Sequence, residues 1–255
     1  MKKSLLCVVL VGIVIVLTGC NTARRPPHLY FDASNPLKRV AVLPLRNDTN
    51  DVDGPNVVRS KMIQALQNRS YTVQDVKETD QILRDRMGIT LGGQLELTTP
   101  KELGETLGVE GVLYGTLMDF DELTTGAYNV KKVRGSFKLV NASNEQIVWQ
   151  RGLGVRSELH MGGSNGRIAA GIARAADSDE KEIPWVTIRQ TNLQTKNLGE
   201  SFAIGLGTKL LSHALRIHLE YESAELARRV SDNVPWGPGP AAVQAPASGV
   251  PAQIK

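Results

Sequence analysis

The order of apolar runs in the first part of the chain predicts an α/β domain. Residues 39–45 form a short continuous apolar run, which is typical of a strand buried on both faces. Apolar residues then recur at helical spacing from Asp53 to Leu66, and residues 71–73 predict another strand. Strand, helix and strand in this order form a βαβ unit. The inner face of the helix is expected to carry Val58, Met62, Ala65 and Leu66.

Two shorter helices are predicted next. The first runs from Thr79 to Met87, with Gly88 placed to end it. The second begins at the segment Thr99-Pro100-Lys101-Glu102, which is a capping box with proline at the first helical position. Gly108 is placed to end this second helix.

Three runs of alternating polarity predict an antiparallel meander that extends the sheet. They cover residues 109–120, 133–139 and 147–155, with Arg151 interrupting the last run. Turns are expected at Gly126 and at residues 141–144. One face of the first strand is expected to carry Val112, Tyr114, Thr116, Met118 and Phe120. The fold class is therefore α/β, a mixed sheet with helices packed on it.

Later segments depart from this pattern. Residues 161–181 form a Gly/Ala-rich insertion, and Glu200–Leu219 predicts a long C-terminal helix. Residues 233–255 are rich in Pro, Ala and Gly, a composition that predicts disorder. Within the insertion, a stripe of small and apolar residues is either a contact surface for a partner or a segment folded back on its own domain. The stripe consists of Ile168, Ala169, Ile172 and Ala173.

The N-terminus predicts a secreted protein. In residues 1–19 a lysine pair is followed by an apolar run too short to span a membrane, which is typical of a signal peptide. The segment Leu17-Thr18-Gly19-Cys20 resembles a bacterial lipobox. That resemblance implies cleavage after Gly19 and lipidation of Cys20. Resemblance to lipoproteins of double-membrane bacteria further implies that retention at the inner membrane usually needs Asp at the second mature position, so Asn21 there points to the outer membrane, facing the periplasm.

The domain organisation follows from these segments. Residues 20–37 form a lipidated tether with a possible docking point at residues 29–31, and residues 38–232 form the α/β domain. Seventeen or so extended residues reach at most about 60 Å. The domain is therefore expected to stay close to the membrane that holds it.

Three blocks carry a family resemblance. Residues 40–45 (VAVLPL), 107–116 (LGVEGVLYGT) and 147–149 (IVW) resemble segments of bacterial lipoproteins of unknown function. The domain of these lipoproteins is similar to the amino-terminal domain of TolB and, more distantly, to the curli secretion lipoprotein CsgG. The resemblance implies a fold and a tethering mode, and it supplies no catalytic motif.

Composition and the candidate reactive residues limit the classes of function that the sequence allows. Lys2 and Lys3 contribute two of the four net positive charges, so the mature chain gives no case for nucleic acid as a partner. The cysteines are Cys7 and Cys20, so the mature domain has no disulfide. No nucleophile and base stand in a recognisable pattern, and the sequence predicts no catalytic residue, no metal, no cofactor and no small-molecule substrate. The histidines, His28, His160, His213 and His218, lack metal-site spacing.

We therefore expect a non-enzymatic lipoprotein that is held to the outer membrane by Cys20 and faces the periplasm. It would be a scaffold or accessory part of an envelope transport or assembly system, and its partners would be other envelope proteins or further copies of itself. One alternative is a subunit of an oligomeric CsgG-type secretion channel. Another is a lipoprotein activator of a cell-wall synthase.

The lipobox prediction is tested by Cys20→Ser. Because lipidation needs the cysteine thiol, the variant should either keep its signal peptide or be released from the membrane. Membrane fractionation and mass spectrometry of the N-terminus distinguish the two results. A processed Cys20→Ser protein that stays in the membrane would contradict the prediction.

Overall fold

The computed structural model describes residues 30–124, 128–160, 183–189 and 219–239. These residues form an α/β fold with a seven-stranded mixed sheet, as the sequence predicts. The strands are β1 (Arg39–Val42), β2 (Arg46–Asn47), β3 (Thr72–Val73), β4 (Gly111–Thr124), β5 (Tyr128–Asn141), β6 (Ile147–His160) and β7 (Trp185–Arg189). The helices are α2 (Gly54–Asn68), α3 (Val76–Met87), the 3-10 helix η1 (Gly92–Leu97), α4 (Pro100–Leu107) and α7 (Glu220–Ser231).

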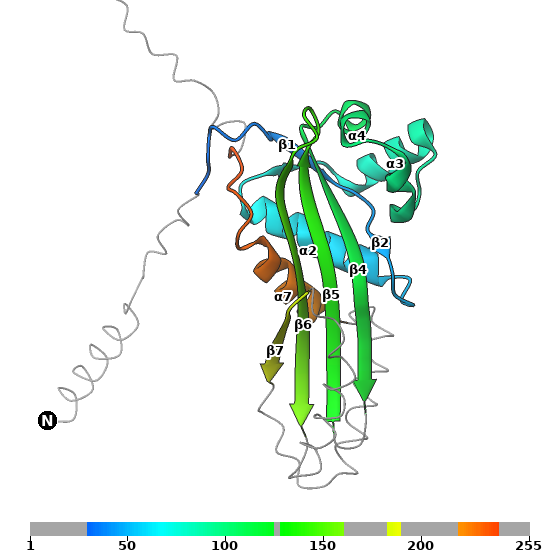
Figure 1. Ribbon diagram of the computed structural model, residues 1–255, viewed down its shortest axis with the longest axis vertical. Coiled ribbons are helices and arrows are strands. Elements are labelled where there is room, and N and C mark those ends of the chain that lie inside the picture. The colour runs from blue at the N-terminus through cyan, green and yellow to red at the C-terminus, as the bar shows by residue number, and fades with distance from the viewer. Residues whose placement is uncertain (1–29, 125–127, 161–182, 190–218, 240–255) are drawn as a thin grey trace, which may run out of the picture.

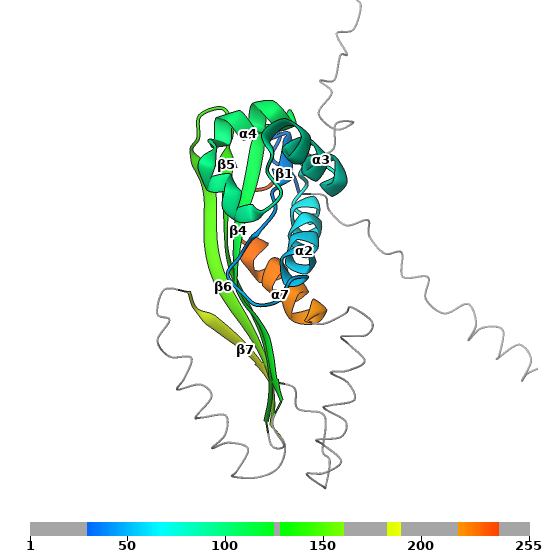
Figure 2. The ribbon, with the colours of Figure 1, turned by 90° about the vertical axis from the view of Figure 1, so that its right-hand side faces the viewer.

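The sheet combines a parallel and an antiparallel part. Its strand order is β3-β1-β4-β5-β6-β7, and β2 pairs with β4. β1 is parallel to β3 and β4, whereas β4, β5 and β6 form an antiparallel meander, and β7 is parallel to β6. Figures 1 and 2 show that β4, β5 and β6 run side by side along the long axis and extend beyond the helices.

β1 is buried on both faces, as its continuous apolar sequence predicts. Val40 and Val42 pack into a core under α2 and α7, and Ala41 packs into a second core under α3 and α4. α2 covers the first face, and all four residues predicted on its inner face are buried. The βαβ unit made by β1, α2 and β3 is therefore confirmed.

The buried guanidinium of Arg59 connects the two layers of helices. It lies on α2 and is 3% exposed. Two of its nitrogens donate to the Val42 carbonyl at 3.0 and 2.7 Å, and it forms a bidentate pair with Asp80 of α3 at 2.9 and 2.7 Å. The buried charge is thereby paired and hydrogen-bonded, which the burial of a charge requires.

Both short helices end as predicted, in left-handed glycines. Gly88 has φ 69° and Gly108 has φ 67°. α3 begins three residues before the predicted Thr79, because the Asp75 carboxylate caps it by accepting from the amides of Lys77 and Glu78. α4 begins after Thr99, whose hydroxyl accepts from the Glu102 amide at 3.2 Å.

The prediction that one face of β4 carries Val112 through Phe120 is wrong. Val112 packs in the α3–α4 core, but Phe120 packs in the α2–α7 core. The pairing with β5 shifts register between Leu117 and Asp119. A bulge there breaks the period of two, so the side chains that follow change face.

Arg151, which interrupts the apolar pattern of β6, has a structural role. Its guanidinium donates to the Arg229 carbonyl of α7 at 2.9 Å. The charged side chain thus satisfies an unpaired carbonyl in the last turn of the helix that covers this strand. Neither α7 nor β7 is predicted from the sequence, and the predicted helix Glu200–Leu219 lies, apart from its last residue, outside the described residues.

Residues 233–239 are ordered and pack against the body, which corrects the prediction that disorder begins at residue 233. Val234 is 2% exposed, and the Gly237 amide donates to the Arg69 carbonyl at 2.7 Å. The guanidinium of Arg69 lies 4.5 Å from the ring centroid of Trp236. Because these contacts hold the segment along the C-terminal end of α2, we call residues 233–239 the C-terminal strap.

The strap also holds the end of the predicted tether. The Asp32 amide donates to the Gly237 carbonyl at 2.9 Å, and the rings of Tyr30 and Trp236 lie 5.6 Å apart. The side-chain amide of Asn35 donates to the Trp236 carbonyl at 2.8 Å. Residues 30–37 are therefore part of the body, and the docking predicted at residues 29–31 is confirmed for Tyr30.

The strap is tested by Gly237→Ala. A Cβ at position 237 would lie 2.5 Å from the Ser70 carbonyl oxygen and 2.7 Å from the Tyr71 nitrogen, and these backbone atoms cannot rotate away. We expect a loss of about 1–3 kcal/mol in the free energy of unfolding, measured in urea. Gly93→Ala is the matched control, since a Cβ there meets nothing within 4 Å. Equal unfolding midpoints for the two variants would contradict this role of the strap.

Candidate functional site

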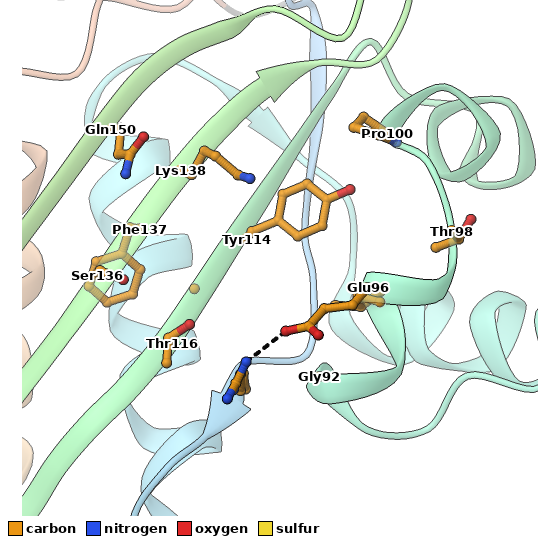
Figure 3. Close-up of a pocket in the computed structure, with 13 residues that line it drawn as sticks. Gly92, Glu96, Thr98, Pro100, Tyr114, Thr116, Ser136, Phe137, Lys138 and Gln150 are labelled. Atoms are coloured by element: carbon orange, nitrogen blue, oxygen red, sulfur yellow. Dashed lines mark hydrogen bonds and ion pairs between the residues drawn. The ribbon is translucent and has the colours of Figure 1, made fainter.

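A cleft of about 380 Å³ lies on the sheet face that carries α3 and α4 (Figure 3). The strands β4, β5 and β6 form its floor, while η1 and the start of α4 form its wall. The cleft is lined by Arg46, Gly92, Leu95, Glu96, Thr98, Pro100, Tyr114, Gly115, Thr116, Ser136, Phe137, Lys138 and Gln150.

The strand register arranges the polar side chains of the floor in two rows. Tyr114 is paired with Lys138, and Lys138 is paired with Gln150, so these three form one row across the strands. Thr116 and Ser136 are also paired and form a second row two residues further along. Two residues of strand are about 6.6 Å. The floor therefore presents five polar side chains in a regular array.

Gly92 and the ion pairs of Arg46 hold the wall of the cleft in place. A Cβ on Gly92 would lie 2.3–2.4 Å from the backbone of Leu45 and Arg46, so only glycine allows η1 to approach this closely. The Arg46 guanidinium pairs with Asp48 at 2.9 Å and with Glu96 of η1 at 2.6 Å. These two carboxylates, Asp48 first, raise the pKa of Arg46.

Lys138 carries the charge of the floor, and Tyr114 lies beside it. The Lys138 ammonium lies 5.1 Å from the ring centroid of Tyr114. Burial, followed by the charge of Glu145, raises the pKa of Tyr114 to about 12. Because the tyrosine keeps its proton at neutral pH, its hydroxyl can donate a hydrogen bond and is a poor base.

The chemistry of this cleft is suited to binding. Its titratable side chains are Arg46, Glu96, Tyr114 and Lys138, and none of them stands beside an activating base as a nucleophile requires. Among the described residues, no group of three or more His, Cys, Asp or Glu is placed to hold a metal ion. The same part of the chain contains no helix long and apolar enough to cross a membrane.

A group of charged residues lies further along the same face. Arg134 pairs with Asp119 at 2.5 Å, and the guanidiniums of Arg134 and Arg156 lie 5.2 and 4.8 Å from the ring centroid of Trp185. The ring of Trp185 packs directly against Gly154. A Cβ at position 154 would lie 2.4 Å from this ring, so the contact requires glycine. These contacts attach β7 to the sheet.

The residues singled out from the sequence do not converge on the cleft. Cys20 and the stripe at residues 168–173 lie outside the described residues, and so do His28, His213 and His218, while His160 ends β6. Sequence reasoning missed the cleft itself. The alternation of Tyr114 with Thr116, and of Ser136 with Lys138, was a signal that one face of the meander is polar.

Comparison with known proteins assigns the family. The family described as "Putative lipoprotein GNA1162-like" matches residues 29–179, more than half of the chain. The chain belongs to this family. The predicted resemblance to bacterial lipoproteins of unknown function is thereby confirmed, whereas the similarity to TolB and CsgG stays a prediction.

Individual relatives are more distant. The chain is similar to putative lipoprotein NMB1124/NMB1162 of Neisseria meningitidis serogroup B, with 24% identity over 145 residues. This match spans 56% of the chain and 66% of the relative. Among solved structures, lipoprotein GNA1162 from N. meningitidis matches 55% of the chain and 99% of its own length, with 20% identity and a TM-score of 0.45. The C-terminal domain of LpoB from Escherichia coli matches 45% and 79%, with 18% identity and a TM-score of 0.32.

The environment of Tyr114 is tested by alkaline titration. Its folded-state pKa of about 12 exceeds the ordinary value of 10.0, so the folded state keeps a proton that the unfolded state loses. Stability should therefore fall as the pH rises from about 10 to 12. Tyr114→Phe should make this fall less steep and remove an ultraviolet phenolate transition near pH 12, with stability at pH 7 nearly unchanged. An identical pH dependence in the variant would contradict the raised pKa of Tyr114.

Proposed function

We propose that this protein is a non-enzymatic lipoprotein of the outer membrane that faces the periplasm and binds other envelope proteins. In this role it is a scaffold or accessory component of an envelope transport or assembly system. Membership of the lipoprotein family supports the lipid anchor, for which Cys20 is the proposed site. Secretion-channel subunit and cell-wall synthase activator stay alternative predictions.

The lining of the cleft is the observation that carries the binding role. Tyr114, Thr116, Ser136, Lys138 and Gln150 come from three adjacent strands and face one open space. Their hydroxyl, ammonium and amide groups recognise polar partners by hydrogen bonds and charge. None of them is activated for covalent chemistry, so the cleft supports recognition and gives no support to turnover.

The attachment of residues 30–37 to the body shortens the proposed tether. If Cys20 carries the lipid, residues 20–29 connect it to the first described residue. Ten extended residues span at most about 35 Å. This bound is somewhat more than half of the roughly 60 Å expected for the whole of residues 20–37, and it favours partners at the same membrane.

The binding role is tested by formaldehyde crosslinking in intact membranes of the native host, followed by purification of the full-length protein. We expect defined adducts with one or a few envelope proteins, identified by mass spectrometry. Cys20→Ser is the control, because loss of the proposed anchor should reduce the adducts at equal protein level. Recovery of monomer alone in every condition would refute the proposal.

A further inference from the structure

We propose that the cleft recognises a carboxylate on an acidic segment of the partner protein, with Lys138 as its cationic contact. This inference rests on the proposed binding function and specifies its chemistry. It follows from the charges of the cleft, the unused hydrogen-bonding groups of its floor and the apolar rim beside it.

Of the two cationic side chains that line the cleft, one is paired with carboxylates and the other is not. Arg46 is already neutralised, because it pairs with both Asp48 and Glu96. Lys138 has no carboxylate within ion-pair distance among the described residues, and its ammonium lies over the ring of Tyr114. The aromatic ring holds the ammonium at the floor without neutralising it. A carboxylate entering the cleft would therefore meet an ammonium that forms no ion pair with a described residue.

Neighbouring groups fit the same ligand. The Tyr114 hydroxyl keeps its proton at neutral pH, so it donates to an acceptor such as a carboxylate oxygen. Thr116, Ser136 and Gln150 have no side-chain hydrogen bond to the part of the chain that the structure describes, and they line the same floor. These groups can bind the remaining carboxylate oxygen and the backbone amides and carbonyls that accompany an acidic side chain.

The rim favours a protein segment over other anions. Leu97 lies between the lining residues Glu96 and Thr98 and is 88% exposed, and Leu91 at the start of η1 is 68% exposed. A peptide supplies apolar side chains next to its acid and can cover both leucines. A membrane surface is disfavoured because a single cation contributes only about 1 kcal/mol to binding anionic lipid. A sugar is disfavoured because it would stack on the ring of Tyr114, and the Lys138 ammonium already lies over that ring.

A zero-length carbodiimide crosslink in membranes tests the contact on the full-length protein. The reagent joins an amine to a carboxylate that is already in contact with it. We expect an amide bond between the Lys138 Nζ and an Asp or Glu of a different protein, mapped by mass spectrometry. Lys138→Arg should abolish this product, since arginine does not couple. Lys77→Arg, which alters an exposed lysine on α3, should leave it unchanged.

A charge reversal separates this inference from the proposed function. Lys138→Glu should reduce formaldehyde adducts at least tenfold, whereas Lys138→Arg, which keeps the charge, should retain most of them. Circular dichroism of both variants checks that the fold is intact. If Lys138→Glu leaves the adducts unchanged, the cleft inference fails and the binding function stands. Coupling of Lys138 only to its own chain, to a second copy or to lipid would also overturn the inference, as would no coupling at all.

Discussion

The ion pair between the buried Arg59 and the partly exposed Asp80 connects the helix layers on the two faces of the sheet. It joins α2, on one face of the sheet, to α3, on the other, at the carbonyl that ends β1. Removing Asp80 would leave the buried Arg59 charge with the Val42 carbonyl as its remaining hydrogen-bond partner among the described residues, which is unfavourable for a buried cation. α3 leads through residues 88–91 into η1, the wall of the cleft, which Gly92 and the Arg46–Glu96 pair hold against β2 and the residue before it.

The cleft exists because the two faces of the sheet are covered unequally. α2 and α7 lie along the first face, and their core reaches from β1 to the buried Val155 of β6. On the second face, α3, η1 and α4 cover β1 and the beginning of β4, so the rows from Tyr114 to Gln150 stay open beside them. Polar residues at these positions suit a surface that stays in contact with water.

Local signals in the sequence were sufficient for β1, α2, α3, α4 and the meander, but not for the register of the sheet or for α7 and β7. The continuous apolar run of β1, the helical spacing in α2 and the glycines that end α3 and α4 each report a local requirement, and each is confirmed. The bulge between Leu117 and Asp119 is set by the pairing with β5. The alternation of polar and apolar residues along β4 alone cannot predict it. Arg151 looked like an interruption because its partner, the Arg229 carbonyl, is 78 residues away.

The cleft was hidden for a related reason. Its floor draws residues from three strands, and its wall depends on Gly92 passing against the backbone at Leu45, so no single segment carries its pattern. Composition likewise misjudged the beginning of the C-terminal tail. A segment rich in proline and glycine does not form a hydrophobic core of its own. Residues 233–239 are ordered without one, because they pack and hydrogen-bond against the C-terminal end of α2 and against residues 30–35.

This packing has a mechanical consequence for an anchored protein. A pull on the proposed lipid anchor would reach the body at Tyr30, whose carbonyl accepts from the Ser70 hydroxyl at 2.7 Å beside the strap. The load would then pass through the hydrogen bonds of Asp32 and Asn35 to the strap and to the end of α2. This route meets the body beside the core of the first face, where Val234 packs, whereas the cleft lies on the second face. The fold thus separates the segment next to the proposed anchor from the part that we propose recognises a partner.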